Sequence, residues 1–213
     1  MTQCITKDDF ARMIAGAAAA IRAQHAVLSE LDCAAGDGDH GATMLRAVEK
    51  LERAFAPDGP EDLKTCLENA GWSVLGVDGG ASSSLLGVFF GGMADAAGIG
   101  VTEMFEAGLA ALRKQTKAQP GDKTMMDALV PAIQAMRAAV DAGKSVREAM
   151  HDAVQAAQAG AEATRKLTAR YGRAKFLGDK TLGHVDPGAA SVSLMFEGFY
   201  RGISNSKGES GNA

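Results

Sequence analysis

Residues 31–41 have the sequence LDCAAGDGDHG, a short stretch that carries three aspartates (Asp32, Asp37 and Asp39) and three glycines between two helix-like segments. Carboxylates this close together repel one another unless a cation lies among them. Because oxygen ligands suit hard cations, Mg²⁺ is the expected ion, with Ca²⁺ or Mn²⁺ as alternatives. The glycines let the backbone turn tightly and leave N–H groups free for an anion. The stretch therefore predicts a metal-binding turn between two helices.

Two other interpretations of this stretch were weighed. Loops rich in Asp and Gly are most often simply solvated, and the motif alone does not decide against that role. An EF-hand fits poorly, because Ala42, Thr43 and Met44 follow where the closing glutamate of such a loop should stand. The choice depends on what the rest of the chain contributes.

The composition is that of one large soluble domain. The chain has 213 residues, of which 46% are hydrophobic and 23% charged. A net charge of −4 and the lack of a basic block disfavour nucleic acid as a partner. No long apolar run or signal peptide is evident, so no membrane contact is expected. Three cysteines without CxxC spacing are typical of a reduced, cytoplasmic protein.

Apolar residues recur at helical spacing along the whole chain, and no run of strand signals occurs. The pattern predicts an all-α domain of about eight amphipathic helices within residues 1–203, followed by a polar tail over 204–213. Pro60 is expected at the first position of the third helix, with Glu61 and Asp62 in its first turn. The expected helices cover residues 7–30, 40–55, 60–74, 85–93, 101–112, 125–142, 145–171 and 189–202.

Three connecting segments carry further signals. Residues 76–84 form a glycine-rich turn that opens onto a helix, which suits a phosphate cradle but on its own also suits a plain helix cap. In the polar turn over 117–124, Asp122 and Lys123 are either a surface pair or nucleotide contacts. Residues 172–188 form a long irregular loop that would offer the positive charges of Arg173, Lys175 and Lys180 to phosphates.

Taken together, these loops resemble the nucleotide-binding L subunit of dihydroxyacetone kinase. The likeness extends over essentially the whole chain, with the motifs in the family's order. The sequence departs from the family at Ser83 and Ser84, which replace Gly-Pro, and at Leu86, which replaces an aromatic residue. The matching stretches are 31–41 (LDCAAGDGDHG), 79–82 (GGAS), 120–125 (PGDKTM), 172–174 (GRA), 177–178 (LG) and 183–189 (GHVDPGA).

The resemblance implies a ring of eight antiparallel helices with the nucleotide bound in the loops at one end. It implies that Asp32, Asp37 and Asp39 hold two Mg²⁺ ions, which bridge the phosphates of ATP or ADP. The implied nucleotide contacts are His40, Gly41, Ala42, Thr43, Ala81, Ser82, Thr116, Met125, Arg173, Asp186, Pro187 and Gly188.

The function implied by the resemblance is that of a phosphoryl-transfer subunit in a kinase for dihydroxyacetone or a related short-chain ketose. The ketose would be held by a separate K subunit, and a phosphoryl-relay subunit and a homodimer are further assemblies it allows. The alternative is a non-catalytic ADP- or ATP-binding regulatory module that docks on another protein. Retention of all three aspartates favours the kinase subunit, because plain nucleotide binding does not need two metal ions. A purely structural bundle would leave the loop motifs unexplained.

Overall fold

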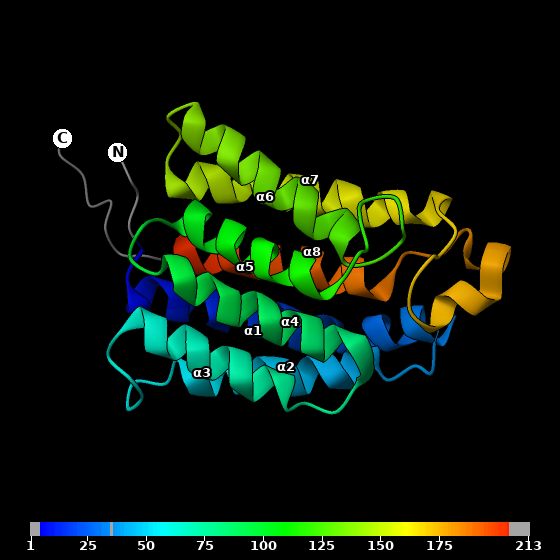
Figure 1. Cartoon of the computed structure of the whole chain (residues 1–213), viewed down its shortest axis with the longest axis horizontal. Helices are drawn as coiled ribbons and strands as arrows, with labels where there is room; N and C mark the ends of the chain where they lie inside the picture. Colours follow the sequence, from blue (N-terminus) through cyan, green and yellow to red (C-terminus); the bar gives the residue numbers. More distant parts are fainter. Residues whose placement is uncertain (1–4, 35, 205–213) are drawn as a thin grey trace.

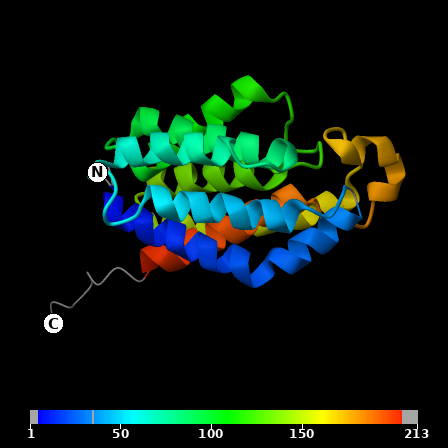
Figure 2. The same ribbon diagram turned by 90° about the horizontal axis from the view of Figure 1, so that it is seen from below.

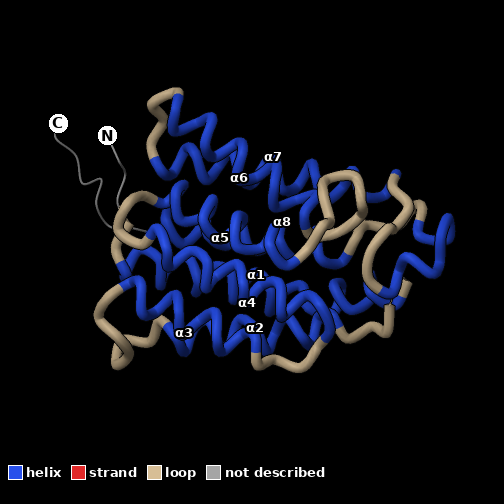
Figure 3. Tube along the Cα trace, viewed as in Figure 1, coloured by secondary structure: helices blue, strands red, loops and turns tan. Residues whose placement is uncertain are grey.

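The computed structural model describes residues 5–34 and 36–204, and all regular structure in these ranges is helical (Figure 3). Of the expected polar tail, only Ser204 falls within the described residues, where it ends the last helix. The long helices are α1 (Lys7–Cys33), α2 (His40–Ala54), α3 (Leu63–Leu75), α4 (Gly80–Met93), α5 (Val101–Gln115), α6 (Met126–Asp141), α7 (Val146–Ala163) and α8 (Pro187–Ser204). Short 3₁₀ helices are η1 (Ala94–Ala96), η2 (Thr164–Lys166) and η3 (Arg173–Thr181).

Each long helix packs against the one before it and the one after it in the chain, and α8 packs extensively against α1 (Figure 1). Since successive helices run in opposite directions, this contact closes an up-and-down ring. The expected all-α ring of eight antiparallel helices is thereby confirmed for the described part of the chain.

The interior of the ring is a single apolar core with few but central aromatic residues. Phe105 lies with its ring centroid 5.5–5.9 Å from those of Phe89, Phe196 and Phe199. Elsewhere the helices approach through small residues. Gly198 of α8 lies directly against the backbone of Ala17 in α1, where a Cβ atom would clash. Residues this small allow the backbones of the two helices to approach closely.

Two helix boundaries differ from the predicted ones for local polar reasons. The helix expected from Pro60 begins at Leu63, because the Asp62 carboxylate caps it by accepting a hydrogen bond from Thr65 N (2.8 Å). The helix expected to reach Tyr171 ends at Ala163. There the hydroxyl of Thr164 donates to the carbonyl oxygen of Ala161 (2.6 Å) as the chain turns into η2.

Three further boundaries bear on the loops. Helix α1 continues to Cys33, so Asp32 lies in its last turn rather than in the loop. Helix α4 begins at Gly80, earlier than expected, and α8 begins at Pro187. The segment expected to be wholly irregular over 172–188 contains η3, which is interrupted at Gly178.

The ring topology brings four connections together at one end. In an up-and-down ring every second connection falls at the same end, and here these are residues 34–39, 76–79, 116–125 and 164–186. Figures 1 and 2 show them at the end away from the start of α1 and the end of α8. The N-termini of α2, α4, α6 and α8 consequently all face this end, which makes it favourable for anions.

None of the described helices has the length and hydropathy that crossing a membrane would require.

An ion-pair cluster of one arginine and two glutamates connects α6 to α5. The guanidinium of Arg137 donates to both carboxylate oxygens of Glu106 (2.9 and 2.6 Å) and to Glu103 (2.9 Å). These partners raise the pKa of Arg137. Each of these side chains is partly exposed, so solvent screening limits what the cluster contributes.

We expect Arg137→Met to lower the free energy of unfolding by about 1 kcal/mol, because it removes a bidentate pair and a second partner at one stroke. Urea denaturation measures this. The control is Arg201→Met, which breaks the pair with Glu197 within α8 and should cost only about 0.3 kcal/mol. Equal losses in the two variants would show that the α5–α6 cluster has no special weight.

Candidate functional site

A cleft of about 270 Å³ lies at the end of the ring where the four connections meet. One side is formed by the acidic loop before α2 and by the first residues of α4. The other side is formed by residues 116–126, 171–174 and 186–188. Most of the lining residues thus lie in a connection or in the first turn of a helix, where backbone N–H groups have no partner within the helix. Asp32 in the last turn of α1 and Leu85 in α4 also contribute.

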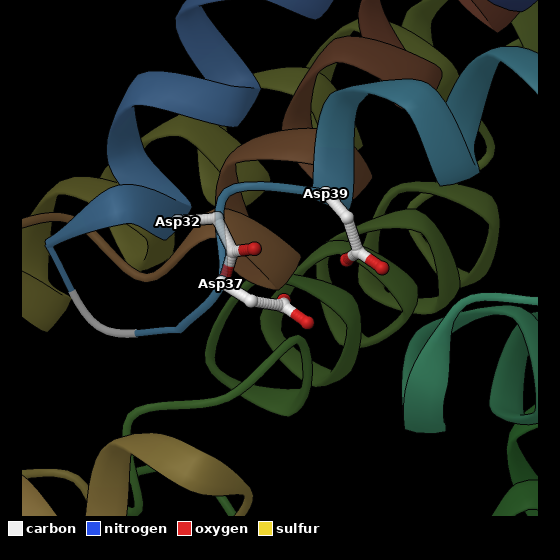
Figure 4. A group of neighbouring side chains, drawn as sticks. All are labelled: Asp32, Asp37 and Asp39. Carbon is white, nitrogen blue, oxygen red and sulfur yellow. The ribbon is translucent and has the colours of Figure 1, made fainter.

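Three carboxylates stand together at the edge of the cleft (Figure 4). Asp32 comes from the last turn of α1, Asp37 from the connecting loop and Asp39 from the residue that precedes α2. One oxygen from each lies within 4.8 Å of the others. Asp39 does not use its side chain to cap α2, although it occupies the capping position. Its carboxylate is therefore left for another partner.

The acidic loop is held in shape by its own backbone. The N–H of Gly36 donates to the Asp32 carbonyl oxygen (2.5 Å), and the N–H of His40 donates to the Asp32 carboxylate (3.3 Å). The donor set is all oxygen and contains no thiolate or imidazole nitrogen. Such a set suits a hard divalent cation such as Mg²⁺.

A positive side chain from a distant part of the chain reaches this cluster. Arg173, at the start of η3, forms an ion pair with Asp37. The guanidinium lowers the pKa of the Asp37 carboxyl, which keeps it ionised. A guanidinium pairs equally well with carboxylate and phosphate oxygens, so Arg173 can serve either an acid or a bound phosphate.

The glycine-rich turn before α4 packs against α2 at the edge of the cleft. Gly79 and Gly80 have φ values of 147° and 72°, which a residue with a side chain rarely adopts. Gly79 also lies against the side chain of Thr43 in α2, where there is no room for a Cβ atom. Arg46 of α2 ties the two segments together by donating to Asp78 O (2.8 Å) and to Thr43 Oγ1 (3.2 Å).

In the wall of the cleft, a buried histidine joins the starts of α2 and α8. Nε2 of His40 lies 3.1 Å from Oγ of Ser191, whose hydroxyl donates to the carbonyl oxygen of Gly188 (2.9 Å). Burial lowers the pKa of His40, so the imidazole is neutral at pH 7. We infer a structural role for it in positioning residues 186–188.

Asp186 caps α8 and also lines the cleft. Its carboxylate accepts from Ala189 N (2.7 Å). Burial, together with the nearby charge of Asp127, raises the pKa of Asp186 to about 7, although Lys123 opposes this shift. At neutral pH this carboxyl is consequently divided between its two protonation states, which enables it to donate or to accept a hydrogen bond.

The structure brings most of the sequence-predicted site residues to the cleft but not all of them. Gly41 packs on α1 behind the cleft, Ala42 is exposed away from it, and Thr43 is buried under Gly79. Lys175 and Lys180 do not line it either. The predicted residues that do are Asp32, Asp37, Asp39, His40, Ala81, Ser82, Thr116, Met125, Arg173, Asp186, Pro187 and Gly188.

The turn before α6 excludes one of the two interpretations considered for Asp122 and Lys123. The two side chains are not a surface pair. Asp122 pairs with Arg170 (3.3 Å), whereas Lys123 is buried. Lys123 lines the cleft, where a nucleotide contact was one of its two interpretations, whereas Asp122 does not line it. Thr124 and Tyr171 also line the cleft without having been singled out as contacts, and the PGDKTM motif was the available signal for Thr124.

The sequence matches a known protein family and two curated relatives over most of its length. Residues 34–201 match the model of the DAK2 domain. The chain is 35% identical over 176 residues to the ADP-binding subunit DhaL of a PEP-dependent dihydroxyacetone kinase of Listeria innocua, covering 80% of this chain and 83% of that protein. It is 37% identical over 177 residues to the corresponding subunit of Escherichia coli, covering 80% and 84%.

A solved structure shows the same fold at greater distance. The crystal structure of the dihydroxyacetone kinase from C. freundii in complex with AMP-PNP and Mg²⁺ superposes with a TM-score of 0.74 and 28% identity. The alignment covers 94% of this chain and 35% of that longer chain. From the matched domain and the shared length with curated subunits, the chain belongs to the family of the DAK2 domain and of the L subunits of dihydroxyacetone kinases.

Proposed function

We propose that this chain is the nucleotide-binding, phosphoryl-transfer subunit of a cytoplasmic kinase for dihydroxyacetone or a related short-chain ketose. The observation that carries the proposal is the convergence of Asp32, Asp37 and Asp39 beside a cleft faced by four helix N-termini. Three carboxylates without a cation would repel a triphosphate, and helix N-termini bind phosphate without any carboxylate. A nucleotide with bound Mg²⁺ complements both groups, because its phosphates suit the helix N-termini and its cations suit the carboxylates.

The residues have distinct tasks in this proposal. Asp32, Asp37 and Asp39 hold two Mg²⁺ ions, which supply charge neutralisation on the phosphate oxygens. The amides at Ala81 and Ser82, in the first turn of α4, bind phosphate through the helix N-terminus. Arg173 adds a positive charge at the rim, where its side chain is 60% exposed.

The opposite wall would receive the nucleoside. Thr116, Met125 and residues 186–188 line that side of the cleft, which offers an apolar surface with a few polar groups. Asp186 is placed to exchange a hydrogen bond with the nucleoside in either protonation state.

The described part of the chain offers no evident site for the sugar. A hydroxyl acceptor needs a positioned base, and the described histidines do not provide one. His40 is engaged with Ser191, and His25, His151 and His184 are exposed and do not line the cleft. The ketose would therefore arrive on a separate K subunit that docks over the mouth of the cleft.

The rim has a side chain suited to such docking. Phe176 in η3 is 82% exposed, close in sequence to Arg173. An exposed phenylalanine beside a functional cleft is typical of a contact that a partner covers. A phosphoryl-relay subunit is a further proposed partner, in keeping with the PEP-dependent names of two relatives. A homodimer of this chain is a further assembly that we propose.

We expect MgADP, at a hundredfold its Kd, to raise the unfolding midpoint by about 5–10 °C, because a ligand that binds only the folded state stabilises it by mass action. Asp39→Asn should abolish most of this rise, and EDTA should do the same for the unsubstituted protein. Without ligand, Asp39→Asn should unfold at the same temperature or higher, since one repelling charge is gone. Differential scanning calorimetry measures all three.

The matched control is Asp95→Asn, which neutralises an exposed aspartate in η1 at the other end of the ring. It should leave the MgADP shift unchanged. A full shift in Asp39→Asn would contradict the metal assignment.

The isolated chain should not phosphorylate dihydroxyacetone or erythrulose with MgATP, because its described residues provide neither a base nor a sugar site. Adding a K-type subunit should give turnover in a coupled assay for ADP. Appreciable turnover by the chain alone would mean that an acceptor site exists on it.

Phe176→Ser should weaken the complex with a K-type subunit by about tenfold, because it removes an exposed aromatic side chain three residues from Arg173 of the cleft. The MgADP shift should be preserved, since Phe176 does not line the cleft. Titration of complex formation by calorimetry provides the comparison. Ile99→Ser, which alters a half-exposed residue at the far end of the ring, serves as the control. Equal affinities for the two variants would place the docking surface elsewhere.

A further inference from the structure

Lys123 has an unusual position for a lysine. It lies in the connection between α5 and α6 and is only 3% exposed. Its ammonium donates to the carbonyl oxygens of Thr164 (2.7 Å) and His184 (2.5 Å). A buried cation is costly unless it is fully partnered. These two bonds therefore decide whether the local structure forms.

The backbone at Lys123 is also strained. Its φ of 60° is the only left-handed value at a non-glycine residue in the described ranges. Two hydrogen bonds to a buried carboxylate hold the turn in this shape. Asp127 accepts them from the N–H groups of Gly121 (2.6 Å) and Thr124 (2.7 Å). Glycine would adopt this conformation more easily than lysine. The presence of lysine indicates that the side chain has a task.

The two carbonyl acceptors belong to a segment far along the chain from Lys123. Thr164 follows α7, and its hydroxyl accepts from Asp186 N (2.9 Å). His184 stands two residues before Asp186. Lys123 thus holds the backbone that leads into α8, and it adjoins Thr124 and Met125 in the cleft wall.

The buried ammonium has two acidic neighbours in this arrangement. Burial lowers the pKa of Lys123, and Arg165 acts in the same direction, whereas the charges of Asp186 and Asp127 favour the charged form and limit the shift. A neutral side chain in the same place would leave two carbonyl oxygens without a donor and two acids without a counter-charge.

We propose that Lys123 is a positioning residue for the nucleotide. It connects the turn before α6 to the segment that leads into α8. It thereby sets the distance between the two parts of the cleft wall, residues 124–126 and 186–188. The inference rests on the proposed function, because it takes the cleft to be the nucleotide site. Lys123 acts here through the residues that it holds and not through its own contact with the nucleotide.

Two substitutions separate the amine from the backbone. Lys123→Met keeps the length of the side chain and removes the amine, and Lys123→Gly removes the amine and relieves the positive φ. We expect both to weaken MgADP binding about tenfold, by calorimetry well below the unfolding midpoint. A merely structural role would lower the midpoint and leave the Kd of the folded protein unchanged. If backbone shape were all that mattered, Lys123→Gly would bind as the unsubstituted protein does.

Two further variants complete the test. Lys144→Met removes a lysine ion pair with Asp152 (2.6 Å) at the other end of the ring and should leave the Kd unchanged. Thr164→Val keeps the carbonyl that Lys123 uses but loses the hydroxyl that receives Asp186 N, so it should also weaken binding. If the Lys123 variants do not fold, the Kd of Thr164→Val for MgADP provides the test in their place. Unchanged affinity in the folded variants would overturn this inference alone. No binding by the unsubstituted protein would overturn the proposed function, and this inference with it.

Discussion

Helices that run alternately in opposite directions around a closed ring leave every second connection at the same end, and the candidate site depends on this constraint. The connections before α2, α4, α6 and α8 are separated by more than a hundred residues of sequence, yet they enclose one cleft. The ring can close only because α1 and α8 approach through Gly198 and Ala17 without bulky side chains between them. Packing along the ring is thus what positions the chemistry at its end.

The electrostatics of this end have two opposite parts. Four helix N-termini favour an anion, while three aspartates at the edge of the same cleft favour a cation. Arg173 is the only group among the cleft-lining residues that forms an ion pair with this acidic cluster in the structure. A phosphate that carries its own divalent ions complements both parts at once. This joint complementarity, rather than either part alone, distinguishes the cleft from an ordinary solvated loop cluster.

The polar groups behind the cleft form a connected framework. His40 joins α2 to the start of α8 through Ser191, Arg46 joins α2 to the turn before α4, and Asp127 shapes the turn before α6. Their partners are largely backbone carbonyl and N–H groups of the loops. Loops without regular secondary structure can hold a defined cleft only when such side chains satisfy their backbone groups.

The sequence by itself determined the helical fold and the residues of the acidic turn. Helical periodicity is a local property, and the motifs in the loops are contiguous, so both can be recognised without coordinates. Two helix boundaries were predicted wrongly. Asp62 begins one helix and Thr164 ends another through side-chain hydrogen bonds, which hydrophobic periodicity does not reveal. Only the tertiary structure decided which of the motif residues reach the cleft. Neighbours such as Asp122 and Lys123 have different partners: the Asp122 carboxylate pairs with Arg170, and the Lys123 ammonium is buried against the carbonyl oxygens of Thr164 and His184. Periodicity cannot show this, because residues 164–184 meet the turn only in the folded ring.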